Sequence, residues 1–302
     1  MARKSVTTRV LFGGLMVALL AGLFALDVWM YRRSGSGESV PGIQMWLGDG
    51  LVVAVLAALA AVLGALEVTV LARHGGAHPL VPATVIGAVL LAVQSFLGFT
   101  FSRFEALLDP PILLSVLFFI LVLGQMLRRQ TAGAAGNLAW SVLALVYIGL
   151  LLSFLVRTRV VFGPGPVILL IVAVKGSDIG AYFSGLLFGR HKLIPWLSPG
   201  KTVEGLVGAV LFSVVLTLIV GSLSIITHGT VLALLDRTYL IVFGIMFALV
   251  GHVGDLTESL LKRSAGVKDS GHLLPEFGGA LDMIDSLLPT GFIWYMALKY
   301  IS

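Results

Sequence analysis

The sequence predicts an all-α fold, a polytopic bundle of about nine transmembrane helices with a polar cavity that faces the cytoplasm. Apolar residues make up 58% of the 302 residues and charged residues 12%, and the mean hydropathy is +1.04. Soluble globular domains do not reach these values, so the bilayer is the solvent for most of the chain. The apolar residues also fall into separate runs of about 20 residues, the length that a helix needs to cross a bilayer.

The predicted spans, in chain order, are 9–30, 50–72, 79–99, 111–127, 137–156, 165–185, 203–225, 237–256 and 285–301. The first run is too long for a signal peptide and has no cleavage site after Tyr31, so we interpret it as a retained span. Lys and Arg favour the cytoplasmic side, and their distribution over the loops predicts that the N-terminus is inside. The two most polar loops, near 186–203 and 257–284, then both face the cytoplasm. Cysteine is absent, which excludes disulfides and thiolate metal sites.

The first part of the chain, residues 1–160, offers little chemistry, and we interpret it as a scaffold with possible dimer contacts. Its ionisable residues within or near spans are Asp27 and Glu67. Because charge is costly at membrane depth, we expect each carboxylate to reach the interface or to cap a helix. The net charge of +5 and the Arg128-Arg129 pair fit an anionic membrane surface and do not imply nucleic acid. Residues 161–302 form the predicted catalytic domain.

The sixth span carries the first functional signal, because Lys175 and Asp178 lie on one helical face and Tyr182 follows one turn later. We predict that these three residues line a substrate site. The alternative is that Lys175 and Asp178 only neutralise each other inside the bundle. Small residues at 176, 180 and 184 form a separate stripe that predicts close approach of another helix.

A polar loop follows, and its Ser198, Lys201 and Thr202 run into a predicted helix that begins near Val203. Hydroxyl groups, backbone N–H groups and one ammonium group at a helix N-terminus can bind phosphate. The alternative is that Ser198 or Thr202 caps the helix.

The strongest signal is the polar stretch from Gly254 to Ser286. Its residues Asp255, Glu258, Ser259 and Lys262 have the spacing i, i+3, i+4 and i+7, which places them on one helical face. Asp282 and Asp285 are three residues apart, and two close carboxylates repel each other unless a cation or a proton lies between them.

The cation that suits this stretch is Mg²⁺, which takes one or two protein carboxylates and completes its coordination with water and phosphate oxygens. We predict Asp255, Asp282 and Asp285 as its ligands, and Lys262, Arg263 and Lys268 as phosphate-binding residues. Acidic and basic residues arranged in this way favour metal-assisted phosphoryl or nucleotidyl transfer. The alternatives are an amphipathic interfacial loop with solvated charges and an ion-coupled transporter.

The same stretch resembles the signature of the phosphatidate cytidylyltransferases, also called CDP-diacylglycerol synthases. The matching positions are Ser259, Lys262-Arg263, Lys268-Asp269, Pro275, Gly278-Gly279, Asp282 and Asp285-Ser286. The resemblance reaches back through Asp255, Glu204-Gly205, Lys201-Thr202, Ser198-Pro199, Tyr182 and Asp178, and so covers roughly residues 175–290. It adds Glu204, Ser259 and Asp269 to the predicted substrate-binding residues.

The resemblance implies transfer of a cytidylyl group from CTP to phosphatidate, with Mg²⁺, in a homodimer of the bacterial cytoplasmic membrane whose active site faces the cytoplasm. The sequence departs from the family pattern at three positions: Phe277 and Met283 stand where His and Arg are usual, and Gly200 where a second basic residue is common. Other CTP-dependent lipid enzymes, such as a polyprenol kinase or an ether-lipid cytidylyltransferase, would use similar residues.

Overall fold

The computed structural model describes residues 2–35, 50–101, 103, 105–223, 231–268 and 279–302. The elements up to residue 162 are α1 (Ala2–Gly35), α3 (Leu51–His74), α4 (Val81–Thr100), α5 (Pro110–Leu127), α6 (Ala134–Ala144), the π-helical segment η2 (Leu145–Leu150) and α7 (Leu151–Phe162). They are followed by α8 (Pro164–Phe188), β1 (Lys192–Ile194), β2 (Ser198–Thr202), α9 (Val203–Gly221), the 3₁₀ turn η3 (Val231–Leu234), α11 (Arg237–Ser264), α12 (Ala280–Ile284) and α13 (Leu287–Ile301). The predicted all-α class is confirmed, with one short antiparallel hairpin, β1–β2, added to it.

Seven helical segments in the described part of the chain are long and apolar enough to cross a membrane. They are α3, α4, α5, the continuous run α6–η2–α7, α8, α9 and α11, and they coincide with the second to the eighth predicted spans. The chain is therefore an integral membrane protein. The first predicted span lies within α1, and the ninth overlaps α13 and begins two residues before it, so the number nine stays a prediction.

The helices begin where the sequence supplies suitable residues. Proline occupies the first turn of α4, α5 and α8, where its missing N–H group would have no helical partner. Asp236 caps α11 by accepting hydrogen bonds from the backbone N–H groups of Thr238 and Tyr239.

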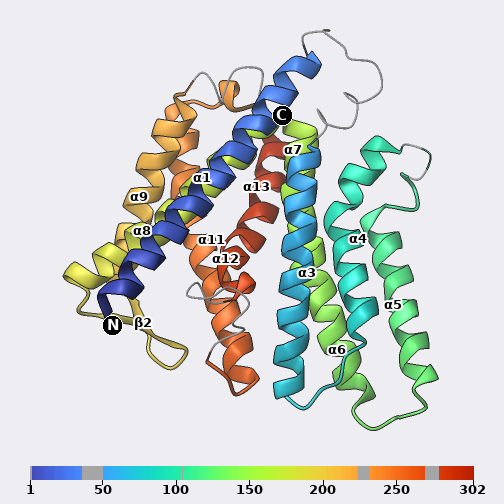
Figure 1. Ribbon diagram of the computed structural model, residues 1–302. Coiled ribbons are helices and arrows are strands. Elements are labelled where there is room, and N and C mark those ends of the chain that lie inside the picture. The colour runs from blue at the N-terminus through green and yellow to red at the C-terminus, as the bar shows by residue number, and fades with distance from the viewer. Residues whose placement is uncertain (1, 36–49, 102, 104, 224–230, 269–278) are drawn as a thin grey trace.

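The helices run side by side in one bundle (Figure 1). In this view α3, α4, α5 and α6 lie on one side, α8 and α9 lie on the other, and α11, α12 and α13 lie between them. Trp294 of α13 is fully buried, its ring packs edge-on against Phe243 and Phe247, and its indole N–H donates to the carbonyl of Pro166 at 3.0 Å. This aromatic contact joins α13, α11 and α8.

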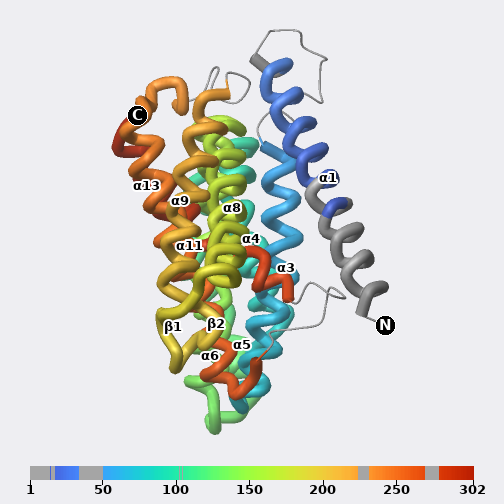
Figure 2. Tube along the Cα trace, turned by 90° about the vertical axis from the view of Figure 1, so that its left-hand side faces the viewer, coloured from blue at the N-terminus to red at the C-terminus, as the bar shows by residue number. Residues whose placement is uncertain are grey.

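Helix α1 lies along the outside of this bundle, as the turned view shows (Figure 2). Its Asp27 is fully buried and forms an ion pair with Arg159 of α7, with 2.6 Å between Oδ2 and Nε. The Arg159 guanidinium also lies over the ring of Tyr31. The prediction that Asp27 reaches the interface or caps a helix is wrong, because a cation from a helix distant in sequence compensates its charge inside the protein.

The N-terminus, the β1–β2 hairpin and the C-terminal end of α11 lie at one end of the bundle, and the C-terminus of the chain lies at the other (Figure 1). The two polar loops of the sequence therefore begin at the same end. We call this the polar end.

Candidate functional site

Close packing of α8 against α9 sets the position of the hairpin between them. A Cβ atom on Gly180 would lie 2.8 Å from the carbonyl oxygen of Gly208, and one on Gly208 would lie 2.0 Å from Oγ of Ser184. The predicted small-residue stripe therefore brings the two helices together, as in small-xxx-small packing. The hairpin spans the short distance between the end of α8 and the start of α9.

Thr202 joins the hairpin to α9 as the helix N-cap. Its Oγ1 accepts a hydrogen bond from the N–H of Gly205 at 3.1 Å, so the capping interpretation is confirmed for this residue. Glu204, in the first turn, accepts from the N–H groups of Arg190 and His191 and from the His191 ring, 2.6 Å away. Its carboxylate thus holds the turn before β1.

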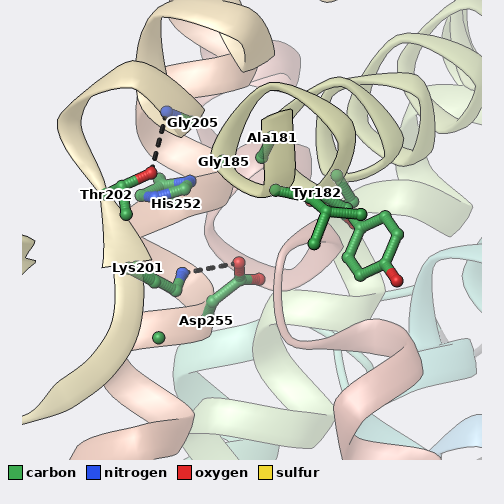
Figure 3. Close-up of a pocket in the computed structure, with 11 residues that line it drawn as sticks. Ala181, Tyr182, Gly185, Lys201, Thr202, Gly205, His252 and Asp255 are labelled. Carbon is green, nitrogen blue, oxygen red and sulfur yellow. Dashed lines mark hydrogen bonds and ion pairs between the residues drawn. The ribbon is translucent and has the colours of Figure 1, made fainter. Parts of the chain in front are cut away.

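A cavity of about 360 Å³ lies between α8, β2, α9 and α11 (Figure 3). Its polar lining consists of Asp178, Lys201, Thr202, His252 and Asp255. Gly200 also lines it, and a Cβ atom on Gly200 would meet nothing within 4 Å. Tyr182 lies at the rim with 66% of its surface exposed. The structure thus gathers residues that the sequence predicted in three separate segments.

Lys201 and Asp255 form an ion pair inside this cavity. The Lys201 Nζ donates to Oδ2 of Asp255 at 2.7 Å, and the two side chains are 17% and 25% exposed. Figure 3 shows the lysine reaching from β2 to the carboxylate on α11. A predicted phosphate-binding residue and a predicted metal ligand therefore neutralise each other in this structure.

A second polar group joins α8 to the start of α13. Lys175 Nζ lies 3.2 Å from Oδ2 of Asp178 and 2.8 Å from Oγ of Ser286. Gly254 lets this segment approach α11, because a Cβ atom there would lie 2.3 Å from the carbonyl oxygen of Asp285. Asp285 itself is buried and accepts the N–H of Ser286.

A third group centres on Lys262, which lies 2.9 Å from Oε1 of Glu258 and donates to Oδ1 of Asp282 at 2.5 Å. Burial disfavours the charged form of Asp282. Hydrogen bonds from Lys262 and from the N–H of Gly279 outweigh this effect and hold the pKa of Asp282 below its ordinary value. The carboxyl groups of Asp282 and Asp285 both lie close enough to Glu258 to interact with it. The three polar groups therefore form one continuous charged region.

Helix α12, which carries Asp282, is fixed by a residue from the N-terminal half. The Glu67 carboxylate of α3 is 2% exposed and accepts the N–H groups of Ala280 and Leu281 at 2.7 and 2.8 Å. The prediction that Glu67 caps a helix is thus confirmed, although the capped helix is more than 200 residues away in sequence.

The remaining predicted residues take several positions. Arg263 and Lys268 are exposed at the end of α11 and just after it, Ser259 is half-buried on the polar face of α11, and Ser198 is half-buried in β2. Met283 is half-buried on α12. Asp269 and Phe277 lie outside the described residues.

His252 and Tyr147 are buried in this region, and neither was singled out from the sequence. His252 precedes Asp255 by three residues, so extending the polar face of α11 by one turn would have found it. Tyr147 comes from η2, its hydroxyl group has no hydrogen-bond partner in the described part of the chain, and it interacts electrostatically with Asp285, Glu258 and Asp255. A π-helical segment often marks a functional position, but nothing in the sequence connects Tyr147 with residues more than 100 positions away.

Among the described residues, no three acidic or histidine side chains are close enough together to hold a metal ion by themselves. Mg²⁺ needs fewer protein ligands, because one or two carboxylates are enough when water and phosphate oxygens complete its shell. The charged region holds five carboxylates, at Asp178, Asp255, Glu258, Asp282 and Asp285, and three ammonium groups, at Lys175, Lys201 and Lys262. Carboxyl groups therefore outnumber ammonium groups here, and the donor set fits a divalent cation that would compensate the carboxylates when they ionise.

Together the fold and the site define an integral membrane protein with a charged cavity at one end of a helical bundle. The chain belongs to the Cytidylyltransferase family, which matches residues 37–301. The resemblance seen in the sequence is thereby confirmed.

The curated relatives include the uncharacterized protein YnbB of Escherichia coli K12, 36% identical over 190 residues, which are 61% of this chain and 61% of that protein. The phosphatidate cytidylyltransferase of Pseudomonas aeruginosa is 50% identical over 123 residues, 41% of this chain and 43% of the relative. That of Mycobacterium bovis is 37% identical over 136 residues, 45% of this chain and 42% of the relative. In each case the match spans less than two thirds of the relative's length.

Proposed function

We propose that the protein transfers a cytidylyl group from CTP to phosphatidate, with CDP-diacylglycerol and pyrophosphate as products. The observation that carries this proposal is the charged region itself, in which carboxylates and lysines from α8, β2, α11 and α12 meet at the polar end of the bundle. Membership of the Cytidylyltransferase family supports the nucleotide. Relatives named phosphatidate cytidylyltransferase support the lipid acceptor.

In this reaction a phosphate oxygen of phosphatidate attacks the α-phosphorus of CTP, and the bond from that phosphorus to the pyrophosphate oxygen breaks. The lipid phosphate is itself the nucleophile, so the protein's task is to position two anionic substrates and to compensate their charge. Lys201 and Lys262 each hold a carboxylate and can transfer their hydrogen bonds to phosphate oxygens. Lys175 and Ser286 offer further donors beside Asp178.

We also propose Mg²⁺ as the cofactor, held by carboxylates among Asp255, Asp282 and Asp285. When bound, the ion compensates the charge of the CTP phosphates and of the leaving pyrophosphate. Asp285 fits this role because it is buried beside the carboxyl groups of Asp255 and Glu258, and the ammonium group of Lys175 compensates only part of their charge. Asp255 and Asp282 would be available to hold the ion when their lysines bind phosphate.

The proposal extends to the surroundings of the site. The polar end faces the cytoplasm, where CTP is found, and the N-terminus is inside. Residues 161–302 supply most of the catalytic groups, and the N-terminal helices support them and contribute to a homodimer. Insertion of a protease site in the hairpin, with cleavage tested in inside-out and right-side-out vesicles, would establish the orientation.

The enzymatic proposal is tested by incubating purified protein with phosphatidate, Mg²⁺ and CTP labelled on the α- or the γ-phosphate. We expect labelled CDP-lipid from α-labelled CTP only, and its loss in Asp285→Asn, which keeps the size of the side chain. Arg190→Gln, an exposed change outside the charged region, serves as the control and keeps activity. Labelled lipid from γ-labelled CTP would instead identify a lipid kinase, and substrate flux into liposomes without either product would identify a transporter.

A further inference from the structure

His252 carries a buried imidazole that has no hydrogen-bond partner in the described part of the chain. The residue is 8% exposed, and its Nε2 atom is buried and forms no hydrogen bond with the described residues. Leaving a buried polar atom unpaired costs about 1–3 kcal/mol. His252 also lines the cavity, so a turn of its ring would bring this nitrogen to a ligand that supplies the missing hydrogen bond.

The position of His252 shows which part of the cavity it serves. On α11 it lies one turn before Asp255 and three turns before Lys262, so it is farther from the polar end than either residue. It lines the same cavity as Lys201, beside Thr202 (Figure 3). A ligand that reaches His252 therefore extends deeper into the bundle than one that binds at Lys262 and Asp282.

The wall opposite His252 belongs to a membrane-spanning helix. Tyr182 and Leu186 of α8 line the cavity and are 66% and 68% exposed, and the neighbouring Phe183 and Leu187 are also exposed. Because α8 is long and apolar enough to cross a membrane, we expect these exposed side chains to face acyl chains. The deep part of the cavity thus combines an apolar edge with Lys201 and His252, which suits a phosphate group attached to a lipid.

We propose that His252 binds the phosphate headgroup of the lipid acceptor by a hydrogen bond, beside the ammonium group of Lys201. This inference rests on the proposed function and assigns the two substrates to different parts of the site. The phosphate of the lipid occupies the deep part of the cavity, next to His252 and Lys201. The phosphates of the nucleotide occupy the part nearer the polar end, around Lys262 and Asp282.

The test compares His252→Leu, which removes both ring nitrogens, with His252→Gln, which keeps a polar group near the position of Nε2. In His252→Leu we expect the KM for phosphatidate to rise about tenfold and the KM for CTP to change less than twofold. His252→Gln recovers most of the affinity for phosphatidate. The matched control is Val253→Ala, at the adjacent residue, which is 57% exposed and does not belong to the lining of the cavity. A rise in the KM for CTP alone would overturn the assignment to the lipid.

A second measurement separates this inference from the proposed function. Binding of phosphatidate to the purified protein, without CTP, is followed by native mass spectrometry against phosphatidylcholine as the competing lipid. We expect His252→Leu to weaken the preference for phosphatidate about tenfold, whether or not the protein forms CDP-lipid. A wild-type protein without CDP-lipid synthesis would refute the proposed function, and equal phosphatidate binding by wild type and His252→Leu would refute the role of His252.

Discussion

Replacing Glu67 by alanine removes the acceptor for two backbone N–H groups at the start of α12, at Ala280 and Leu281. A hydrogen bond to a charged group contributes about 1.5–3 kcal/mol, so the two bonds together contribute about 3–6 kcal/mol. The groups left behind are buried, and water cannot replace the carboxylate without entering the core. We expect α12 to shift, and Asp282 to move with it.

Because Asp282 moves with α12, we expect the lost hydrogen-bond energy to raise the activation free energy of the reaction. About 1.4 kcal/mol of activation free energy corresponds to a tenfold change in rate. We expect kcat/KM for CDP-lipid formation to fall at least about 100-fold in Glu67→Ala. The fall in Glu67→Gln is nearer tenfold, because one amide oxygen still accepts one N–H group. The assay is the synthesis of CDP-lipid from α-labelled CTP, together with thermal unfolding in detergent.

Thr69→Ala is the matched control on the same helix. Thr69 is also 2% exposed, but its hydroxyl group donates only to the carbonyl of Leu66 within α3. Its kcat/KM should remain within about threefold of the wild-type value. If Glu67→Ala unfolds at the wild-type temperature and also keeps its kcat/KM within threefold, the cap does not position Asp282 and the reasoning fails.

Three further changes test the packing and the charges. Gly180→Val should lower the unfolding temperature and the activity, because a Cβ atom there would lie 2.8 Å from a backbone oxygen of α9; Gly136→Val, where nothing lies within 4 Å, should change the activity little. Asp27→Asn leaves the Arg159 charge buried without its carboxylate and should destabilise the protein by about 3–5 kcal/mol, a loss that Asp27→Leu combined with Arg159→Leu partly reverses. The pKa of Asp282 is lowered on folding, so its contribution is fully present above the ordinary pKa of 3.8 and is lost as the pH falls through the lower, folded value. The unfolding temperatures of wild type and Asp282→Asn should therefore converge in acid and differ at neutral pH.

Local patterns in the sequence predicted much of the site, because spacing along one helix survives folding unchanged. The polar face of α11 is present as predicted, with Glu258 and Lys262 buried. The small residues of α8 lie against α9. Each of these features depends only on the 3.6-residue period of a helix.

Features that depend on pairing between distant helices could not be predicted in this way. Asp27 and Arg159 are 132 residues apart, and Glu67 and Ala280 are 213 apart. From the sequence we predicted that each carboxylate reaches the interface or caps a helix. Glu67 does cap a helix, although that helix is distant in sequence, and the prediction is wrong for Asp27. Tyr147 was missed for the same reason, because its hydroxyl group comes to the charged region from the other half of the chain.

The ion pair between Lys201 and Asp255 predicts that removal of the lysine strengthens the binding of Mg²⁺ and weakens the binding of phosphate. In the structure the Lys201 ammonium group neutralises a carboxylate that we propose as a Mg²⁺ ligand, and so it competes with the metal for Asp255. A phosphate group attracts the same ammonium group and leaves the carboxylate available, so phosphate and metal assist each other's binding.

Lys201→Met removes the competing cation and also the phosphate donor. We expect the nucleotide-free variant to bind Mg²⁺ about three- to tenfold more tightly than wild type, since a partly buried ion pair contributes roughly 1 kcal/mol. The same variant should bind phosphatidate more weakly, because Lys201 is the proposed partner of the lipid phosphate. Both affinities can be measured by titration calorimetry, and Lys192→Met in the exposed strand β1 of the same hairpin controls for the loss of one positive charge. If Lys201→Met weakens the binding of Mg²⁺ as well as that of phosphatidate, the lysine supports the fold of the cavity and does not exchange between carboxylate and phosphate.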